Sequence, residues 1–195
     1  MIKISLALAT LLIPGVAFSQ EPPLSGLIVG AQAGYQSRSV EYFVGNVDFS
    51  KARDDFVYGA FVGYDIPVDR LRLGIQAELM DGSSTLWSDD GAGTEYIVEP
   101  KGVSYAFTAR AGFLVGPRSM IYARGGYAAE KNRTVFTGPT ILSIPIKRRD
   151  EGLLVGAGFE SELTSGITPR VEYRYRDLPN KLSSHQLLAG VGYRF

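Results

Sequence analysis

Eight stretches of this chain alternate apolar residues with small or polar residues at every second position. They lie at residues 26–36, 55–66, 70–80, 102–115, 120–130, 152–163, 167–176 and 184–195. A period of two is typical of β-strands, because successive side chains of a strand project to opposite faces. Each stretch is about 10–14 residues long, which is enough for a tilted strand to cross a bilayer. The pattern predicts an all-β protein.

The connections between these stretches alternate in length. Short ones lie at 67–69, 116–119 and 164–166, long ones at 37–54, 81–101 and 131–151, and a medium one at 177–183. A soluble β-sandwich gives no reason for this alternation, whereas outer-membrane barrels have short periplasmic turns and long external loops. An even number of strands also permits closure. We therefore expect an eight-stranded antiparallel up-and-down transmembrane β-barrel.

The first 19 residues have the features of an export signal. Lys3 is followed by a mainly apolar run at 4–13, a Pro-Gly break, and small residues at Ala17 and Ser19. This is the pattern of a cleaved secretory signal peptide, although an uncleaved anchor is the alternative. No later segment holds 18 consecutive apolar residues, which excludes a helical membrane protein. We expect a signal peptide at residues 1–19 and a barrel domain at residues 20–195.

The two faces of the predicted strands differ sharply. In the seventh stretch Val171 and Tyr173 share an apolar face, while Arg170, Glu172 and Arg174 share a charged one. The apolar face would be the core of a sandwich but the lipid-facing surface of a membrane barrel. Aromatic residues near both ends of the apolar faces favour the barrel, because membrane barrels carry aromatic girdles at both interfaces.

Inward faces would then hold a balanced set of charges. An eight-stranded barrel has an interior just wide enough for side chains, so arginines and carboxylates can fill it, with glycines making room for them. We expect this network to close the lumen. Its predicted members, beside Asp65 and Glu130, are Arg72, Glu78, Arg110, Arg124, Glu160, Glu162, Arg170, Glu172, Arg174, Arg176 and Arg194.

Three stretches carry a family resemblance. Residues 121–128 (IYARGGYA), 171–178 (VEYRYRDL) and 188–195 (LAGVGYRF) resemble the small opacity-type, OmpA-like outer-membrane β-barrel family, often labelled porin family proteins. The resemblance concerns the barrel domain only, without the periplasmic peptidoglycan-binding domain of OmpA. It implies the outer membrane of a Gram-negative bacterium, structural or surface-interaction roles and sometimes modest pore activity, and it transfers no catalytic residue.

The last strand also resembles the recognition signal of bacterial outer-membrane barrels. Apolar residues at alternate positions lead to a final phenylalanine, which implies recognition by the barrel-assembly machinery during biogenesis. The residues of this predicted assembly signal are Leu187, Ala189, Val191, Tyr193 and Phe195.

The third long connection offers a candidate lipid contact. Lys147, Arg148 and Arg149 could bind lipopolysaccharide phosphates, since guanidinium groups bind phosphate with two hydrogen bonds. Pairing with Asp150, Glu151 or the acidic second connection is the alternative. Apolar runs at 135–136 and 141–146 predict that the fifth and sixth strands continue as a hairpin above the membrane. Such hairpins could bind surface or host proteins, or pack against one another.

Signals for catalysis or metal binding are weak. Ser183 and His185 share an outward face, as in outer-membrane lipid A deacylases, but the eighth stretch has no acid there to orient the histidine. Asp89 and Asp90 lie in an acidic connection that does not match the EF-hand spacing. The chain has no cysteine and no net charge, so thiolate chemistry is excluded and nucleic-acid binding disfavoured. We predict no catalytic residue, metal or cofactor.

Three functions remain open. The first is a structural and surface-interaction role with a closed lumen, the second a narrow porin-like channel for ions or small solutes, and the remote third a lipid A-modifying enzyme. The expected partners are outer-membrane lipid and lipopolysaccharide, the assembly machinery, and surface or host proteins. We expect a monomer, because a closed barrel has no free strand edges.

Overall fold

The computed structural model describes residues 22–44, 47–82, 86–89, 95–99, 103–138, 141–163, 166–178 and 182–195. The predicted signal peptide at 1–19 lies outside these residues. No helix in the described ranges is long and apolar enough to cross a membrane. The strands are β1 (Gly26–Val44), β2 (Val47–Val68), β3 (Leu71–Gly82), β4 (Leu86–Asp89), β5 (Glu95–Glu99), β6 (Ser104–Gly116), β7 (Ser119–Gly138), β8 (Ile141–Ser161), β9 (Ile167–Leu178) and β10 (Leu182–Arg194).

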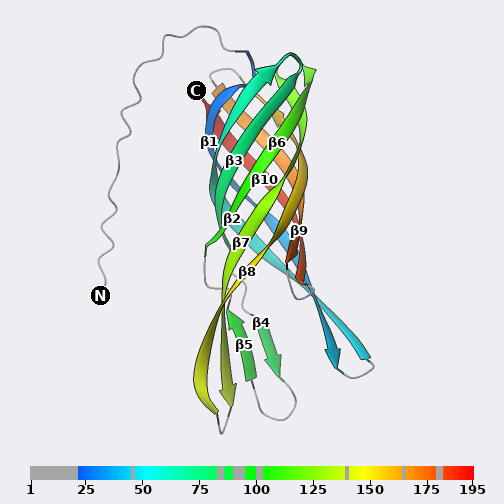
Figure 1. Ribbon diagram of the computed structural model, residues 1–195, viewed down its shortest axis with the longest axis vertical. Coiled ribbons are helices and arrows are strands. Elements are labelled where there is room, and N and C mark those ends of the chain that lie inside the picture. Colours follow the sequence, from blue (N-terminus) through cyan, green and yellow to red (C-terminus); the bar gives the residue numbers. More distant parts are fainter. Residues whose placement is uncertain are drawn as a thin grey trace, which may run out of the picture.

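Eight of these strands close into a barrel, as the sequence predicts. Each pairs antiparallel with its neighbours in the order β7-β6-β3-β2-β1-β10-β9-β8, and the pairing of β7 with β8 completes the circle. The strands run steeply inclined around the barrel axis (Figure 1). Closure gives every wall strand a hydrogen-bonded neighbour on both sides. A strand in lipid requires this, because the hydrocarbon offers no hydrogen-bond partner for backbone N–H and C=O groups.

The external connections are shorter than predicted, because much of them is strand. β1 and β2 stay paired from Gly26↔Asp65 to Val44↔Val47, so most of 37–54 is hairpin rather than loop. The predicted continuation of the fifth and sixth strands is confirmed, since β7 and β8 pair as far as Gly138↔Ile141. Within 81–101, β4 and β5 form a further hairpin whose β5 pairs with β7. These hairpins project beyond one end of the barrel (Figure 1).

The opposite end of the barrel carries the tight turns. β2 and β3 are joined by residues 69–70, where Asp69 has a φ of 54°, and Gly166 precedes β9 with a φ of 78°. Asp tolerates this left-handed region better than most residues, and glycine enters it freely. Short turns mark the periplasmic end of an outer-membrane barrel, so the projecting hairpins lie outside the cell.

The two faces of the wall are inverted relative to a soluble protein, which confirms the predicted assignment. On β9, Val171 is 52% exposed and Glu172 only 1%. Large apolar side chains cover the outer surface, and aromatic residues occur toward both ends. Tyr35 and Phe56 meet edge to face at the external end, and Tyr193 and Phe195 do so at the periplasmic end. Lipid therefore solvates the apolar face, and the polar groups are enclosed.

Reversing the polarity of one lipid-facing position tests this assignment. Val171→Arg should lower the free energy of unfolding by about 2–4 kcal/mol, because Arg is poorly tolerated near the bilayer midplane. Leu153→Arg is the matched control, because Leu153 pairs with Tyr127 near the external rim and should lose only about 0–1 kcal/mol. Denaturant titration in lipid vesicles measures both. Equal losses would contradict the placement of the membrane on the barrel.

Candidate functional site: the barrel lumen

Near the periplasmic end, two arginines and two carboxylates form a closed ring across the lumen. Arg110 Nε lies 2.9 Å from Asp65 Oδ1, and its Nη2 lies 3.1 Å from Glu160 Oε2. Arg194 Nη1 lies 2.9 Å from Asp65 Oδ2, and its Nη2 contacts Glu160 Oε1. Each guanidinium thus bridges both carboxylates. This periplasmic ring is electrically neutral and draws one residue each from β2, β6, β8 and β10.

A second ring of the same composition lies toward the external side. Arg124 Nη2 is 2.9 Å from Glu78 Oε2, and its Nη1 is 3.5 Å from Glu172 Oε2. Arg174 contacts Glu78 Oε1 through Nη1, and its Nε lies 3.0 Å from Glu172 Oε1. This external ring is also neutral and comes from β3, β7 and β9. On the β1 side, Gln32 Nε2 donates to Glu78 Oε2 at 3.2 Å.

Arg170 lies between the rings and is held mainly by neutral groups. Its Nη1 donates to Gln76 Oε1 at 2.9 Å and its Nη2 donates to Gln32 Oε1, whereas Glu172 Oε2 is 3.8 Å away. Its Cζ lies 3.6 Å from the centroid of the Phe61 ring, a cation–π contact. For Arg170, two amide oxygens and the face of the Phe61 side chain therefore take the place of the second carboxylate that each arginine of the periplasmic and external rings contacts.

The Phe61 ring needs glycine on the facing strands. Gly30 and Gly192 are direct cross-strand partners in the β1–β10 ladder. A Cβ on Gly30 would lie 2.4 Å from Phe61 Cζ, and one on Gly192 would lie 2.7 Å from Ile28 Cδ1. Any side chain at Gly30 would displace the aromatic ring on which Arg170 rests. Glycine at these inward positions is thus needed for the packing around Arg170.

The periplasmic mouth is filled by the chain that precedes β1. Leu24 is fully buried against Met120 and Tyr122, and it has a φ of 59°. Arg72, which lies below the periplasmic ring, donates from Nε to the carbonyl of Pro23 at 2.9 Å. The sequence predicts Glu162 in the charge network. The structure places it instead at this mouth, where Glu162 Oε2 accepts from the Leu24 backbone N–H at 2.7 Å.

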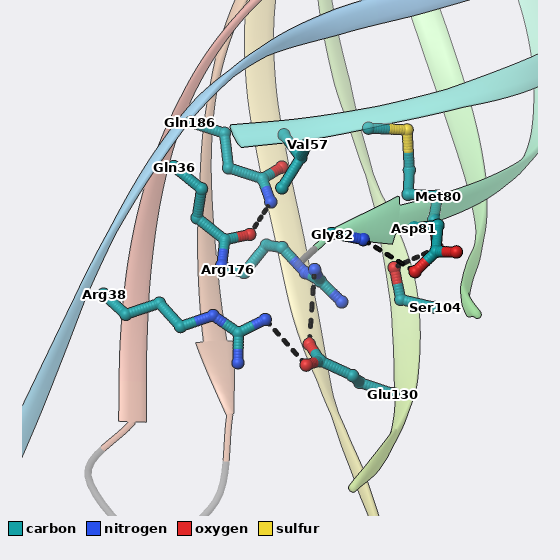
Figure 2. Close-up of a pocket in the computed structure, with 10 residues that line it drawn as sticks. All are labelled: Gln36, Arg38, Val57, Met80, Asp81, Gly82, Ser104, Glu130, Arg176 and Gln186. Carbon is teal, nitrogen blue, oxygen red and sulfur yellow. Dashed lines mark hydrogen bonds and ion pairs between the residues drawn. The ribbon is translucent and has the colours of Figure 1, made fainter. Parts of the chain in front are cut away.

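At the external mouth, two arginines share one carboxylate. Arg38 Nη2 is 2.6 Å from Glu130 Oε1, and Arg176 Nη1 is 3.6 Å from Glu130 Oε2. Figure 2 shows these side chains converging from β1, β7 and β9 on a small pocket beside Gln36 and Gln186. The pocket has a volume of about 20 Å³. A single water needs about 10–15 Å³, so the space suits one water rather than a solute.

Sequence reasoning missed the neutral half of this packing. Tyr122 donates from its hydroxyl to Glu172 Oε2 at 2.7 Å and lies 4.7 Å beneath the Arg110 guanidinium, so it joins the two rings. Gln32, Gln76 and Phe61 hold Arg170. All four lie at inward positions of the alternation, which was a usable signal. The pattern of charged residues alone does not identify them, because none of the four side chains is charged.

The candidates outside the lumen take three different positions. The predicted assembly residues Leu187, Ala189, Val191 and Tyr193 lie exposed on the lipid-facing side of β10, and Phe195 is exposed directly after this strand. His185 is also outward, and its Nδ1 lies 2.7 Å from the Tyr173 hydroxyl. Residues 147–149 belong to β8, but the side chains of Lys147, Arg148 and Arg149 lie outside the described part of the structure.

The acidic second connection is only partly described. Asp89 ends β4 and Glu95 begins β5, while residues 90–94 lie outside the described ranges. Among the residues that the structure does describe, no three His, Cys, Asp or Glu side chains gather in a way that could hold a metal ion.

A closed eight-stranded barrel with an apolar exterior and a charge-filled interior defines a small integral protein of the bacterial outer membrane. The chain belongs to the family described as outer membrane protein beta-barrel domain, whose model matches residues 5–195.

Relatives and solved structures agree with this assignment. A 25 kDa outer-membrane immunogenic protein of Brucella ovis is 32% identical over 145 residues, which cover 73% of this chain. The match spans 65% of that relative, so the chain corresponds to a little under two thirds of its length.

Two solved outer-membrane proteins share the fold. Neisserial surface protein A has a TM-score of 0.56 at 18% identity, covering 88% of this chain and 98% of its own. Ail, the attachment invasion locus protein of Yersinia pestis, solved with the heparin analogue sucrose octasulfate, has a TM-score of 0.54 at 15% identity. That comparison covers 87% of this chain and 99% of Ail.

Removing one carboxylate from the external ring should destabilise the barrel strongly. Glu172→Gln leaves Arg124 and Arg174 with one carboxylate between them, and breaking a buried ion pair typically costs about 3–5 kcal/mol. Glu151→Gln is the matched control, because Glu151 lies at the external rim and accepts from the Tyr127 hydroxyl, where about 0–1 kcal/mol is expected. Denaturant titration compares the two. Similar losses would argue against the ring as a structural element.

Proposed function

We propose that this protein is a closed outer-membrane scaffold that presents β-hairpins at the cell surface and does not conduct ions. The observation that carries the proposal is the pair of neutral rings, since each joins strands on different sides of the lumen. Arg170 and Phe61 fill the layer between them. Leu24 and Met120 add buried apolar packing at the periplasmic mouth of the lumen.

The surface role is supported by the shape of the external end. The β1–β2 and β7–β8 hairpins extend the barrel wall well beyond the level at which β9 and β10 end (Figure 1). The β4–β5 hairpin adds to β7, which gives a small sheet outside the membrane. Relatives named as immunogenic are in keeping with surface exposure. Paired strands can present side chains to surface or host proteins in fixed positions.

We propose a non-enzymatic role on the geometry around His185. A catalytic histidine needs a group that orients it, commonly a carboxylate. The described contacts of His185 are aromatic instead, namely the Tyr173 hydroxyl and the Tyr175 ring at 5.0 Å between centroids. These contacts suit an interfacial residue in the external aromatic belt. We further propose that the barrel is monomeric, since its wall strands are paired on both sides.

Electrical recording tests the closed lumen. Mature protein comprising residues 20–195, refolded into planar bilayers and checked by its heat-dependent gel shift, should give no steady single-channel current. A Glu78→Ser/Arg124→Ser variant removes one neutral pair from the external ring and should also stay silent, because the periplasmic ring remains. Adding Asp65→Ser and Arg110→Ser should allow openings. Steady openings of the unaltered protein that change in Arg124→Ser would overturn the proposal in favour of a narrow channel.

The role of the last strand in assembly is a separate proposal. Phe195 is exposed to lipid at the periplasmic end, where its ring packs edge to face with Tyr193. If the barrel-assembly machinery recognises this residue, Phe195→Ala should reduce the amount of folded protein in the outer membrane several-fold. Phe113→Ala, which alters another exposed aromatic residue at the same end, is the control. Unchanged membrane levels of Phe195→Ala would contradict the assignment.

A further inference from the structure

Residues 22–25 enter the periplasmic mouth of the barrel without joining its wall. The ladders of β1 begin at Gly26↔Asp65 with β2 and at Ile28↔Arg194 with β10, so neither ladder includes these four residues. Gly26 has a φ of 85°, a left-handed conformation that lets the chain change direction between the wall and the mouth. We call residues 22–25 the N-terminal segment.

The side chain of Leu24 anchors this segment in an apolar pocket. It is fully buried against Met120 and Tyr122 of β7, and the partly buried Leu114 of β6 packs beside them. Met120 and Tyr122 are themselves buried. Since these three residues form the whole of this buried cluster in the described structure, removal of Leu24 would open the pocket to water from the periplasmic side.

Two charged side chains hold the main chain of the segment from opposite sides. Arg72 Nε donates to the carbonyl of Pro23 at 2.9 Å, and Glu162 Oε2 accepts from the N–H of Leu24 at 2.7 Å. This carbonyl and this N–H belong to the same peptide group. Hydrogen bonds in which one partner is ionised are stronger than neutral ones, so Arg72 and Glu162 together form a binding site for one peptide group beside the leucine pocket.

The barrel itself positions both charged side chains. Arg72 is buried, and its Nη1 donates to the carbonyls of Asp69 and Leu71 at 3.0 Å and 2.9 Å. Glu162 follows β8 directly, and its backbone N–H donates to the carbonyl of Arg118 at 2.8 Å. None of these bonds involves the N-terminal segment. The site for the peptide group therefore persists when the segment leaves.

The segment is held by few interactions. Within the described part of the structure, two hydrogen bonds join it to the barrel, and a third is internal, from the Ser25 hydroxyl to the Pro22 carbonyl. Leu24 has a φ of 59°, which is unfavourable for a residue with a side chain, and ordering four residues costs conformational entropy. Its release breaks no ladder bond, so the segment can open locally while the barrel stays folded.

We propose that Arg72, Glu162, Met120 and Tyr122 form a peptide-binding site at the periplasmic mouth, which the protein's own N-terminal segment occupies reversibly. The ligand is an extended peptide that presents a leucine side chain to the pocket and the preceding peptide group to the two charges. Proline before the leucine suits this ligand, because it restricts the backbone before binding. The inference goes beyond the scaffold role and does not depend on it, because the two rings close the lumen with or without the segment.

An introduced thiol tests whether the segment covers the pocket. The chain has no cysteine, so Met120→Cys provides a single reactive group beneath Leu24. Protein comprising residues 20–195 is refolded in detergent micelles, checked by its gel shift, and labelled with a membrane-impermeant maleimide. Adding Leu24→Ala should speed labelling about ten- to hundredfold, since burial of a leucine side chain changes an equilibrium by about that factor.

Leu27→Ala is the matched control. Leu27 is also a leucine of the N-terminal region, but it faces lipid on β1 opposite Tyr64, so its loss should leave the labelling rate unchanged. Equal rates in Leu24→Ala and Leu27→Ala would overturn the proposal. Loss of the gel shift in Leu24→Ala alone would also overturn it, because the segment would then be part of the barrel fold rather than a reversible occupant.

A peptide added in solution tests recognition by the site. Leu24→Asp prevents the chain's own segment from filling the apolar pocket, so the thiol of Met120→Cys should be labelled rapidly. Millimolar acetyl-Pro-Pro-Leu-Ser-amide should then slow labelling at least fivefold, and the same peptide with alanine in place of leucine should not. Adding Glu162→Ala should remove the protection. No protection by the leucine peptide, or equal protection by the alanine peptide, would overturn the proposal.

Discussion

The circumference of the barrel is the constraint on which the rest of the structure depends. Eight strands enclose a space only as wide as the side chains that line it. Any charge placed there loses its water, so it must meet an opposite charge across the lumen or be held by dipoles. The two rings meet this demand with equal numbers of arginines and carboxylates, and Arg170 meets it with amide oxygens and a ring face. Filling the lumen and satisfying the charges within it are therefore one requirement.

The barrel was predictable from the sequence because lipid imposes a strict period of two on every strand that crosses it. That period located the eight wall strands and assigned Arg110, Glu160 and Arg174 to the interior. It predicted that β7 and β8 continue as a hairpin above the membrane, but it left most of residues 37–54 and 81–101 as connections, where the structure has further strands. Glu162 follows the period but lies beyond the last ladder residue of β8, so it turns to the Leu24 backbone instead. The ion-pair partners across the lumen depend on the shear of the closed barrel, that is, on how far each strand is shifted along its neighbour. The alternation of residue types along the sequence does not specify this shear.

The external half of the β7–β8 hairpin is a direct continuation of the barrel wall. Within the membrane, outward positions are apolar and inward positions hold the charge. Above it, β7 and β8 remain paired without a register shift from Lys131↔Arg149 to Phe136↔Ile144. One continuous pair of strands thus passes from the hydrocarbon layer into the space outside the membrane. The hairpin is fixed to the barrel by this continuity, so whatever it binds is held at a set height.

The residues of the rings come from alternate strands of the barrel, and this limits how such a barrel could gain strands. Membrane barrels are built of hairpins, and adding one hairpin would widen the wall by two strands. Here the periplasmic ring takes its members from β2, β6, β8 and β10, and each guanidinium contacts two carboxylates directly. A ten-stranded version would separate these groups and admit water between them. The interior of this protein thus fixes its strand number, and a larger relative would need a new interior as well as another hairpin.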